Sequence, residues 1–391
     1  MRLICSISRL TFGAIMLTAA PQRYANAQPR TLRVQSAALG ETRIVHVQLP
    51  ADYAIARQRY PVVLLLDGQV KAFFDLTVAT TNYNLTGDGH PYEMPQQIVV
   101  GVEQGDRSSD LVQRAEAFRK FLVDELLPRI DKDYRTLPFR TLIGHSLGGR
   151  FALGALCKSS NAFPAVIAIS PSLPDSLAKE VTRCVNDKTP HSLRSLVISG
   201  GSLETRTVGN VEQLLGTLSA TPNPDWRIHR VDAKDLGHTH TPLVTIPLGL
   251  RFVFDAIAWD LPNATRDSLS KQLGDPEQVL AHGVADLSSR LGFPAQPPAN
   301  GLIAVVQTWL SRRDASRATA AAERLVALYP EFVLSHTMLA DARELAGDAA
   351  GTRKAIAAAL DVSSKIAWFD ETQKAQVQDQ LKRALAQRGQ P

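Results

Sequence analysis

The residues best suited to chemistry in this chain are one serine, one glutamate and a pair of histidines, in that order along the sequence. The serine is in Gly144-His145-Ser146-Leu147-Gly148, the glutamate ends Gly201-Ser202-Leu203-Glu204, and the histidines are in Leu236-Gly237-His238-Thr239-His240. A serine hydroxyl is a weak nucleophile until a base removes its proton and a carboxylate orients that base. The three kinds of side chain together therefore indicate nucleophilic acyl transfer.

Ser146 needs a rigid turn to present its hydroxyl, and the flanking sequence predicts one. Residues 141–143 are apolar and β-favouring, as in a buried strand, while small and apolar residues recur at helical spacing from Phe151. A strand that turns directly into a helix tolerates only small neighbours, and this geometry is the nucleophile elbow of α/β-hydrolases. The motif also occurs in ordinary glycine-rich turns, but the strand before it and the helix after it favour the elbow.

The acid is predicted from the order nucleophile, acid, histidine that this fold uses. Glu204 comes just after the apolar stretch SLVISGG and is the predicted acid. Asp232 and Asp235 are rivals, but both lie on the loop of the histidines themselves. An exposed carboxylate that caps the following helix is the structural alternative for Glu204.

The base is predicted to be His238 rather than His240. Gly237 gives His238 a flexible neighbour, which helps a loop to place an imidazole over the elbow. His240 is then expected at the pocket rim, as a substrate contact or a solvated side chain. His145 is expected to pack at the elbow and not to act as the base.

A developing oxyanion requires two preorganised donors. The backbone N–H of Leu147, directly after the nucleophile, is the first expected donor. The second should come from the turn after the earlier buried strand, at Gly68 or Gln69.

The surrounding segments predict an α/β fold with a mostly parallel sheet, because strand and helix patterns alternate. Strands are expected at 42–49, 60–66, 97–102, 141–143, 165–170, 195–201 and 226–231. Helices are expected at 115–130, from 151 onward and at 208–218, with Pro128 interrupting the first of them.

Several stretches resemble the putative-esterase (esterase D-like) family of α/β-hydrolases, which includes trilactone siderophore esterases and feruloyl- or acetylxylan-type esterases. The matching stretches are YPVVLLLDG, IVVGVEQGDRSSDL, FLVDELLPRIDKDYRT, RTLIGHSLGG, ISPSL, GSLE and GH-x-x-x-P-L-x-x-x-x-x-GLRFVF, over roughly residues 30–256. The resemblance implies Ser146 as nucleophile, the GSLE glutamate as acid and the loop histidine as base. It also implies that Arg107 and Asp110 line the site, with a salt-bridged loop as an equal alternative.

Two spacings refine that resemblance. In the family pattern the catalytic histidine precedes a proline by four positions and GLR by eleven, and Pro242 and Gly249 stand at those distances from His238. Relatives often carry tryptophans after the SPSL segment, whereas Pro174 and Asp175 follow it here. The pocket is therefore expected to differ, and the physiological ester is left open.

Residues 1–27 have the pattern of a secretory signal peptide: a charged start, an apolar run and a small-x-small end at Ala25-Asn26-Ala27. Cys5 precedes the apolar run, which argues against a lipoprotein anchor. Removing the three arginines of this segment lowers the formal charge from +5 to +2, too little to indicate a nucleic-acid or membrane-surface partner. The protein is expected to be exported, periplasmic or secreted, with no later membrane span.

The sequence pattern changes after Trp259, where alanine-rich helical patterns replace the strand patterns. The similar stretches DASRATAAAERLVAL and DAAGTRKAIAAALDV begin at Asp314 and Asp348. Their separation matches the period of tetratricopeptide repeats. A plain helical bundle is the alternative. The expected domains are a signal peptide at 1–27, an esterase domain at 28–260 and a helical, tetratricopeptide-like region at 261–391.

These patterns jointly predict an exported serine carboxylic-ester hydrolase without a metal or organic cofactor. Siderophore lactones and small acyl esters are the two substrate classes left open. The alternative is a catalytically idle scaffold whose helical tail binds a protein partner. Cys157 and Cys184 are equally compatible with a disulfide and with two buried thiols.

Overall fold

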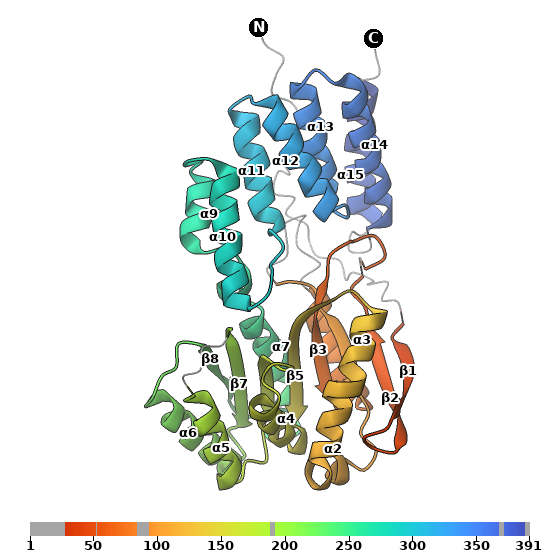
Figure 1. Ribbon diagram of the computed structural model, residues 1–391. Coiled ribbons are helices and arrows are strands. Elements are labelled where there is room, and N and C mark those ends of the chain that lie inside the picture. Colours follow the sequence, from red (N-terminus) through yellow and green to blue (C-terminus); the bar gives the residue numbers. More distant parts are fainter. Residues whose placement is uncertain (1–27, 52, 84–93, 188–191, 367–370, 388–391) are drawn as a thin grey trace.

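The computed structural model describes residues 28–51, 53–83, 94–187, 192–366 and 371–387, which form a sheet-containing part and a helical part (Figure 1). The expected signal peptide, residues 1–27, lies outside the described residues. Two separate sets of apolar clusters fill the two parts: residues 39–254 supply the clusters around the sheet, and a third cluster draws chiefly on residues from Leu261 onward.

The sheet has eight strands in the order β1-β2-β4-β3-β5-β6-β7-β8. They are β1 (Arg30–Ser36), β2 (Glu41–Gln48), β3 (Tyr60–Leu66), β4 (Ile98–Val102), β5 (Thr136–His145), β6 (Ala165–Ile169), β7 (Arg194–Gly201) and β8 (Trp226–Ala233). β1 and β2 pair antiparallel, as do β2 and β4, and all the other neighbours run parallel. The mostly parallel sheet is confirmed. β1 was missed because its side chains are largely exposed and show no buried run.

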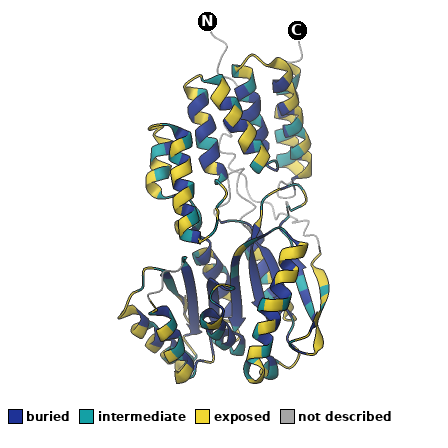
Figure 2. Ribbon diagram, in the orientation of Figure 1, coloured by how far each residue is buried: buried dark blue, intermediate teal, exposed yellow. Residues whose placement is uncertain are grey.

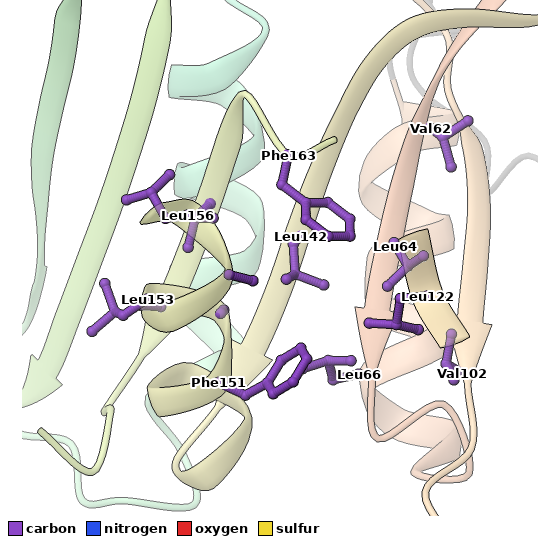
Figure 3. Packing of buried hydrophobic residues seen from close by; sticks show 14 of the residues in the cluster. Val62, Leu64, Leu66, Val102, Leu122, Leu142, Phe151, Leu153, Leu156 and Phe163 are labelled. Carbon is purple, nitrogen blue, oxygen red and sulfur yellow. The ribbon is translucent and has the colours of Figure 1, made fainter. Parts of the chain in front are cut away.

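Helices cover both faces of this sheet, and the side chains of β3 pack into the apolar clusters on both faces. Its alternate side chains Val62, Leu64 and Leu66 enter one apolar cluster (Figure 3), while Val63 and Leu65 enter the other. The first cluster is covered by α2 (Ala115–Lys120), α3 (Leu127–Asp133), α4 (Leu147–Lys158), α5 (Asp175–Val185) and α6 (Thr205–Ser219), and the second by α1 (Lys71–Tyr83) and α7 (Pro242–Val253). Both faces are buried, so β3 reads as a continuous apolar run.

The helix expected across residues 115–130 is interrupted before Pro128, as predicted. It divides into α2, the π-helical segment η3 (Phe121–Leu126) and α3, and another π-helical segment, η2 (Ser109–Gln113), precedes it. Pro128 lies in the first turn of α3, where its missing N–H is tolerated. The α-helical pattern thus gives way to a π-helical one before the proline, and a new α-helix begins at Leu127.

We expected no later segment long and apolar enough to span a membrane, and by length and composition alone this expectation is wrong. Pro242–Trp259, which contains α7 and α8 (Ala256–Trp259), meets that criterion of length and apolarity. Ile246, Leu250 and Val253 of α7 are fully buried against the sheet. The apolar character of this segment thus has an explanation within the folded domain.

The helical part begins with α9 (Asn263–Ser270) and α10 (Pro276–Leu291). Two helix pairs and a final helix follow: α11 (Ala299–Ser311) with α12 (Ala315–Leu328), α13 (Val333–Leu345) with α14 (Ala349–Lys365), and α15 (Glu371–Gln387). The interval from the start of α11 to that of α13 equals the interval from the start of α12 to that of α14, and both match the tetratricopeptide period. Asp314 and Asp348 cap α12 and α14 alike, each accepting a hydrogen bond from the N–H three residues on. Figure 2 shows the buried faces of these helices turned toward one another.

The helical part meets the sheet at the amino-terminal ends of its parallel strands. A cleft of about 1130 Å³ lies there, lined by Arg59 before β3, Pro95 before β4 and Leu137 early in β5, together with Tyr329 and Phe332 of the tail. The carboxyl ends of the same strands point away from the tail (Figure 1). A seven-residue strand spans roughly 20 Å, so the two edges of the sheet are well separated.

Candidate active site

Ser146 forms the turn between β5 and α4 at the carboxyl edge of the sheet. Its backbone has φ 59° and ψ −113°, a conformation that non-glycine residues rarely adopt. A side chain at Gly144 would collide with the backbone of Gly148. The close approach of strand and helix thus requires glycine at that position, and the turn has the geometry of a nucleophile elbow.

Glu204 and His238 meet beside this turn although they come from different loops, one after β7 and the other after β8. His238 Nδ1 lies 2.5 Å from Glu204 Oε2. Glu204 occupies the position before α6, but its side chain makes no capping hydrogen bond there. Its carboxylate therefore orients the histidine instead of capping the helix, which was the structural alternative.

The carboxylate of Glu204 is held by groups to which the sequence assigned no role. Its Oε1 accepts hydrogen bonds from the Ser170 hydroxyl at 2.7 Å, from the Gly201 N–H at 3.0 Å and from the Thr241 hydroxyl at 3.4 Å. Burial opposes ionisation, but the bonds from Ser170, His238 and Gly201 outweigh it and lower the pKa of Glu204. The ionised carboxylate can thus accept the Nδ1–H of His238 and fix the orientation of that ring.

The role of Ser170 was not predicted, although its position in the sequence gives one indication of it. It directly follows the buried strand β6, at the same edge of the sheet as Ser146, and its own backbone has φ 40°. A polar residue immediately after a buried parallel strand is a candidate for the site at that edge.

His145 packs at the elbow, as expected. Its ring lies 5.7 Å from that of Phe73 and 4.5 Å from that of His238, centroid to centroid. Its Nε2–H donates to the backbone carbonyl of His238 at 3.0 Å. Burial and the neighbouring His238 lower the pKa of His145 to about 4, so the ring is neutral near pH 7. His145 thus ties the histidine loop to the elbow.

The three candidate oxyanion donors differ in their availability. The N–H of Gly68 donates to Val102 O at 2.8 Å, within the contact between the end of β3 and β4. Leu147 is the first residue of α4, where N–H groups have no partner within the helix. Gln69 is exposed and follows Gly68 at the same edge of the sheet. Gly68 is therefore excluded as a donor, and Leu147 and Gln69 remain the candidates.

Arg107 lies between the β3–α1 turn and the elbow. Its Nε and Nη2 donate to the two carboxylate oxygens of Asp67 at 2.6 and 2.9 Å, and Nη2 also donates to the His145 carbonyl at 2.7 Å. Asp67 is buried and has φ 59°. The guanidinium thus joins two loops of the site.

Asp110 takes the salt-bridged arrangement that the sequence left open. It is fully buried, and it accepts hydrogen bonds from Arg43 at 2.6 Å, from Arg114 at 3.3 Å and from the Gly105 N–H at 3.1 Å. A side chain with no exposed surface cannot line a substrate pocket, so the implied role of Asp110 is replaced by a structural one.

The remaining side chains singled out from the sequence lie at the surface or in the core. His240, Asp232 and Asp235 are exposed, and the carboxylate that bonds His238 is that of Glu204. Cys157 and Cys184 are free thiols. The structure therefore has two thiols and not a disulfide at these positions. A hydrogen bond between the two thiols, together with burial, raises the pKa of Cys157.

Comparison with known proteins places the chain in a family. A family model described as Putative esterase matches residues 36–231. The ferri-bacillibactin esterase BesA of Bacillus subtilis (strain 168) is 31% identical over 147 residues, which cover 35% of this chain and 51% of that protein. The match thus spans about half the length of that curated relative.

Two solved structures share the fold at lower identity. An IroE-like serine hydrolase from Shewanella oneidensis is 21% identical, with a TM-score of 0.61 over 78% of this chain and 100% of the other. An uncharacterised protein from Capnocytophaga ochracea DSM 7271 is 18% identical, with a TM-score of 0.59 over 92% of this chain and 100% of the other. The match to the second structure covers 92% of this chain, which is more than the segment 28–260 contains, so it extends into the helical region. The chain belongs to the Putative esterase family, with an α/β-hydrolase fold followed by an all-helical region.

Proposed function

We propose that the protein is an exported serine carboxylic-ester hydrolase that uses Ser146, His238 and Glu204 as a catalytic triad. The observation that carries the proposal is the 2.5 Å contact between Glu204 and His238 beside the strained turn at Ser146. An idle scaffold has no need of a glutamate held by three donors and aimed at a histidine. The family of the chain and its esterase relative in Bacillus subtilis support the same reaction class.

The proposed reaction has two halves that share one oxyanion site. His238 Nε2 takes the proton of the Ser146 hydroxyl while Oγ attacks the ester carbonyl, and the N–H groups of Leu147 and Gln69 stabilise the tetrahedral oxyanion. The alcohol leaves with the proton from His238, and an acyl-enzyme remains on Ser146. Water, deprotonated by His238, then attacks the acyl carbonyl. The Oγ–acyl bond breaks, His238 returns the proton to Ser146 Oγ, and the acid is released.

The proposed tail function is an interaction surface of tetratricopeptide type. The helix pairs that recur at the tetratricopeptide period and the matching aspartate caps support this assignment. The tail lies at the edge of the sheet opposite Ser146, so a protein partner bound there leaves the substrate entrance free. Export rests on the sequence pattern of residues 1–27, and the mass of the mature protein from an expressing cell tests it directly.

An activity panel on the purified mature protein tests the main proposal. It contains short- and medium-chain aryl esters, feruloyl esters, and cyclic trilactones with and without ferric iron. We expect hydrolysis of a short-chain aryl ester, and a loss of ~10³- to 10⁶-fold in kcat in Ser146→Ala. A higher kcat/KM for trilactones than for every simple ester would select the siderophore class. Full activity in Ser146→Ala would refute the mechanism, and no hydrolysis of any ester would favour the scaffold.

A further inference from the structure

Arg107 holds together two loops that the proposed mechanism needs in a fixed relation. One loop carries Asp67 and, two residues later, the proposed oxyanion donor Gln69. The other is the turn at Ser146, directly after His145, the last residue of β5. Arg107 reaches both, with two hydrogen bonds of 2.6 and 2.9 Å to Asp67 and one of 2.7 Å to the His145 carbonyl.

Asp67 needs such support because of its backbone and its burial. Its φ of 59° is in the left-handed region, which disfavours an aspartate compared with a glycine. Its carboxylate is buried, and its N–H is bonded to the side chain of Gln104. A buried carboxylate without a partner would be costly, so the guanidinium stabilises both the charge and the turn that contains it.

Asp67 also lies directly over the start of the elbow helix. A methyl group added at Gly148 would lie 3.5 Å from Asp67 Oδ2, in ordinary contact. The turn after β3 and the first turn of α4 therefore pack against each other through this carboxylate. A displacement of Asp67 would move the loop of Gln69 relative to Ser146 and Leu147.

We propose that Arg107 and Asp67 are positioning residues that set the place of the Gln69 donor relative to Leu147 and the nucleophile. This inference rests on the proposed function and assigns a role in it to a pair that touches no reacting atom. The planar fork of an arginine can bind both carboxylate oxygens and a carbonyl at once, whereas a lysine ammonium is a single point of contact. Replacing the fork should loosen the loop that carries the Gln69 donor without removing that donor.

The effect should appear in the transition state and not in substrate binding. Loss of a complete oxyanion donor costs ~10²- to 10³-fold in kcat, and a misplaced donor should cost less, ~10- to 100-fold. The alternative is that Arg107, whose side chain is about one-third exposed, contacts the substrate directly, as the family resemblance implied. A direct contact of that kind should raise KM and leave kcat nearly unchanged.

The test compares Arg107→Lys, Asp67→Asn and the double variant with the wild type on one short-chain aryl ester. Arg114→Lys is the matched control, because Arg114 also binds a buried aspartate, Asp110, but touches neither loop of the site. Binding of an alkyl boronic acid, which forms a tetrahedral adduct with an active-site serine, reports on the oxyanion geometry. Melting temperature and circular dichroism report on folding.

We expect Arg107→Lys and Asp67→Asn each to lower kcat by ~10- to 100-fold with KM within ~3-fold, and the double variant to be little worse than either single one. The inhibition constant for the boronic acid should rise in parallel with the loss of kcat/KM, and Arg114→Lys should change neither. A raised KM with normal kcat, additive losses, or full activity in either folded variant would overturn the inference. If one variant fails to fold, the kcat and KM of the other variant relative to the wild type decide the question. A wild type that hydrolyses no ester would refute the proposed function instead.

Discussion

Left-handed backbone is found at different places in the two parts of the molecule. In the sheet-containing part, the non-glycine residues with positive φ include Asp67, Ser146 and Ser170, which directly follow the carboxyl ends of β3, β5 and β6. In the helical part, Gly292, Arg313 and Gly347 have positive φ where helices end. Left-handed backbone therefore accompanies the candidate site in the first part, whereas in the second it lies in the connections between helices.

The polar contacts differ in the same way. Around Ser146, half-buried and buried side chains bond one another across distant segments, as in the bonds of Glu204 to Ser170 and His238. In the tail, aspartates cap their own helices through N–H groups three residues away. Changes at the carboxyl edge should thus affect catalysis, whereas changes in the tail should affect stability or partner binding.

The largest expected effect separates two histidines on one loop. His238→Gln should lower kcat by at least ~10³-fold, because the base is lost while the elbow remains. His240→Gln should stay within ~3-fold, since His240 is exposed and Glu204 bonds the other ring. Steady-state kinetics on an aryl ester, with circular dichroism as the folding check, measures both. A collapse of kcat in His240→Gln alone would reverse the assignment.

A smaller effect is expected when the acid loses one of its supports. Ser170→Ala should lower kcat by ~10-fold, because Glu204 keeps its bonds from Gly201 and His238 but its carboxylate is less fixed. Ser172→Ala, at an exposed position two residues later, is the control and should keep wild-type kcat. Equal kinetics for the two variants would show that the hydroxyl of Ser170 has no part in orienting the acid.

The tail should contribute stability but no chemistry. Leu325→Ala, at a fully buried position between the tail helices, should lower the free energy of unfolding of the tail by ~2–5 kcal/mol and leave kcat within ~2-fold. A chain ending at Asp260 should likewise hydrolyse esters if it stays soluble, although its exposed apolar surface should favour aggregation. Denaturant titration and initial rates give the two quantities. A soluble truncation that is inactive on every ester would place tail residues in the substrate entrance.

The smallest effect concerns the pH dependence of stability. His145 has a folded-state pKa of about 4, below its ordinary value of 6.5, because it is buried and faces His238, with Arg107 and Asp67 nearby. Between these values the unfolded chain binds a proton that the folded chain does not, so this group makes stability fall as pH drops from about 6.5 to 4.

His145→Gln removes that titration while retaining a side-chain donor. Its unfolding midpoint in urea should therefore fall less between pH 7 and 4.5 than that of the wild type. His240→Gln, at an exposed position, should retain the wild-type slope. Identical slopes in all three proteins would mean that His145 is not the group responsible.

The sequence was sufficient wherever a pattern is local. Apolar runs predicted strands β2 to β8. Pro128 predicted an interruption of the helix, and a π-helical segment is found just before it. The order of Ser146, Glu204 and the histidine loop predicted which carboxylate meets a histidine, because that order follows from the fold. The spacings to Pro242 and Gly249 favoured His238 over His240 as that histidine.

What the sequence did not predict depends on which loops the sheet brings together. Ser170 and Thr241 reach Glu204, and Arg107 reaches Asp67, only because the ends of parallel strands share one edge. The apolarity of α7 is likewise ambiguous from composition, since a core helix and a membrane-spanning helix have the same pattern. Tertiary contacts decide each of these cases.

The most direct test of the central claim is the site at which a fluorophosphonate reacts, found by peptide mass mapping of the full-length protein. Our account predicts one adduct, on Ser146, formed quickly by the wild type, much more slowly by His238→Gln, and not at all by Ser146→Ala. An adduct on another serine, or ester hydrolysis that continues in protein whose Ser146 is fully labelled, would contradict it.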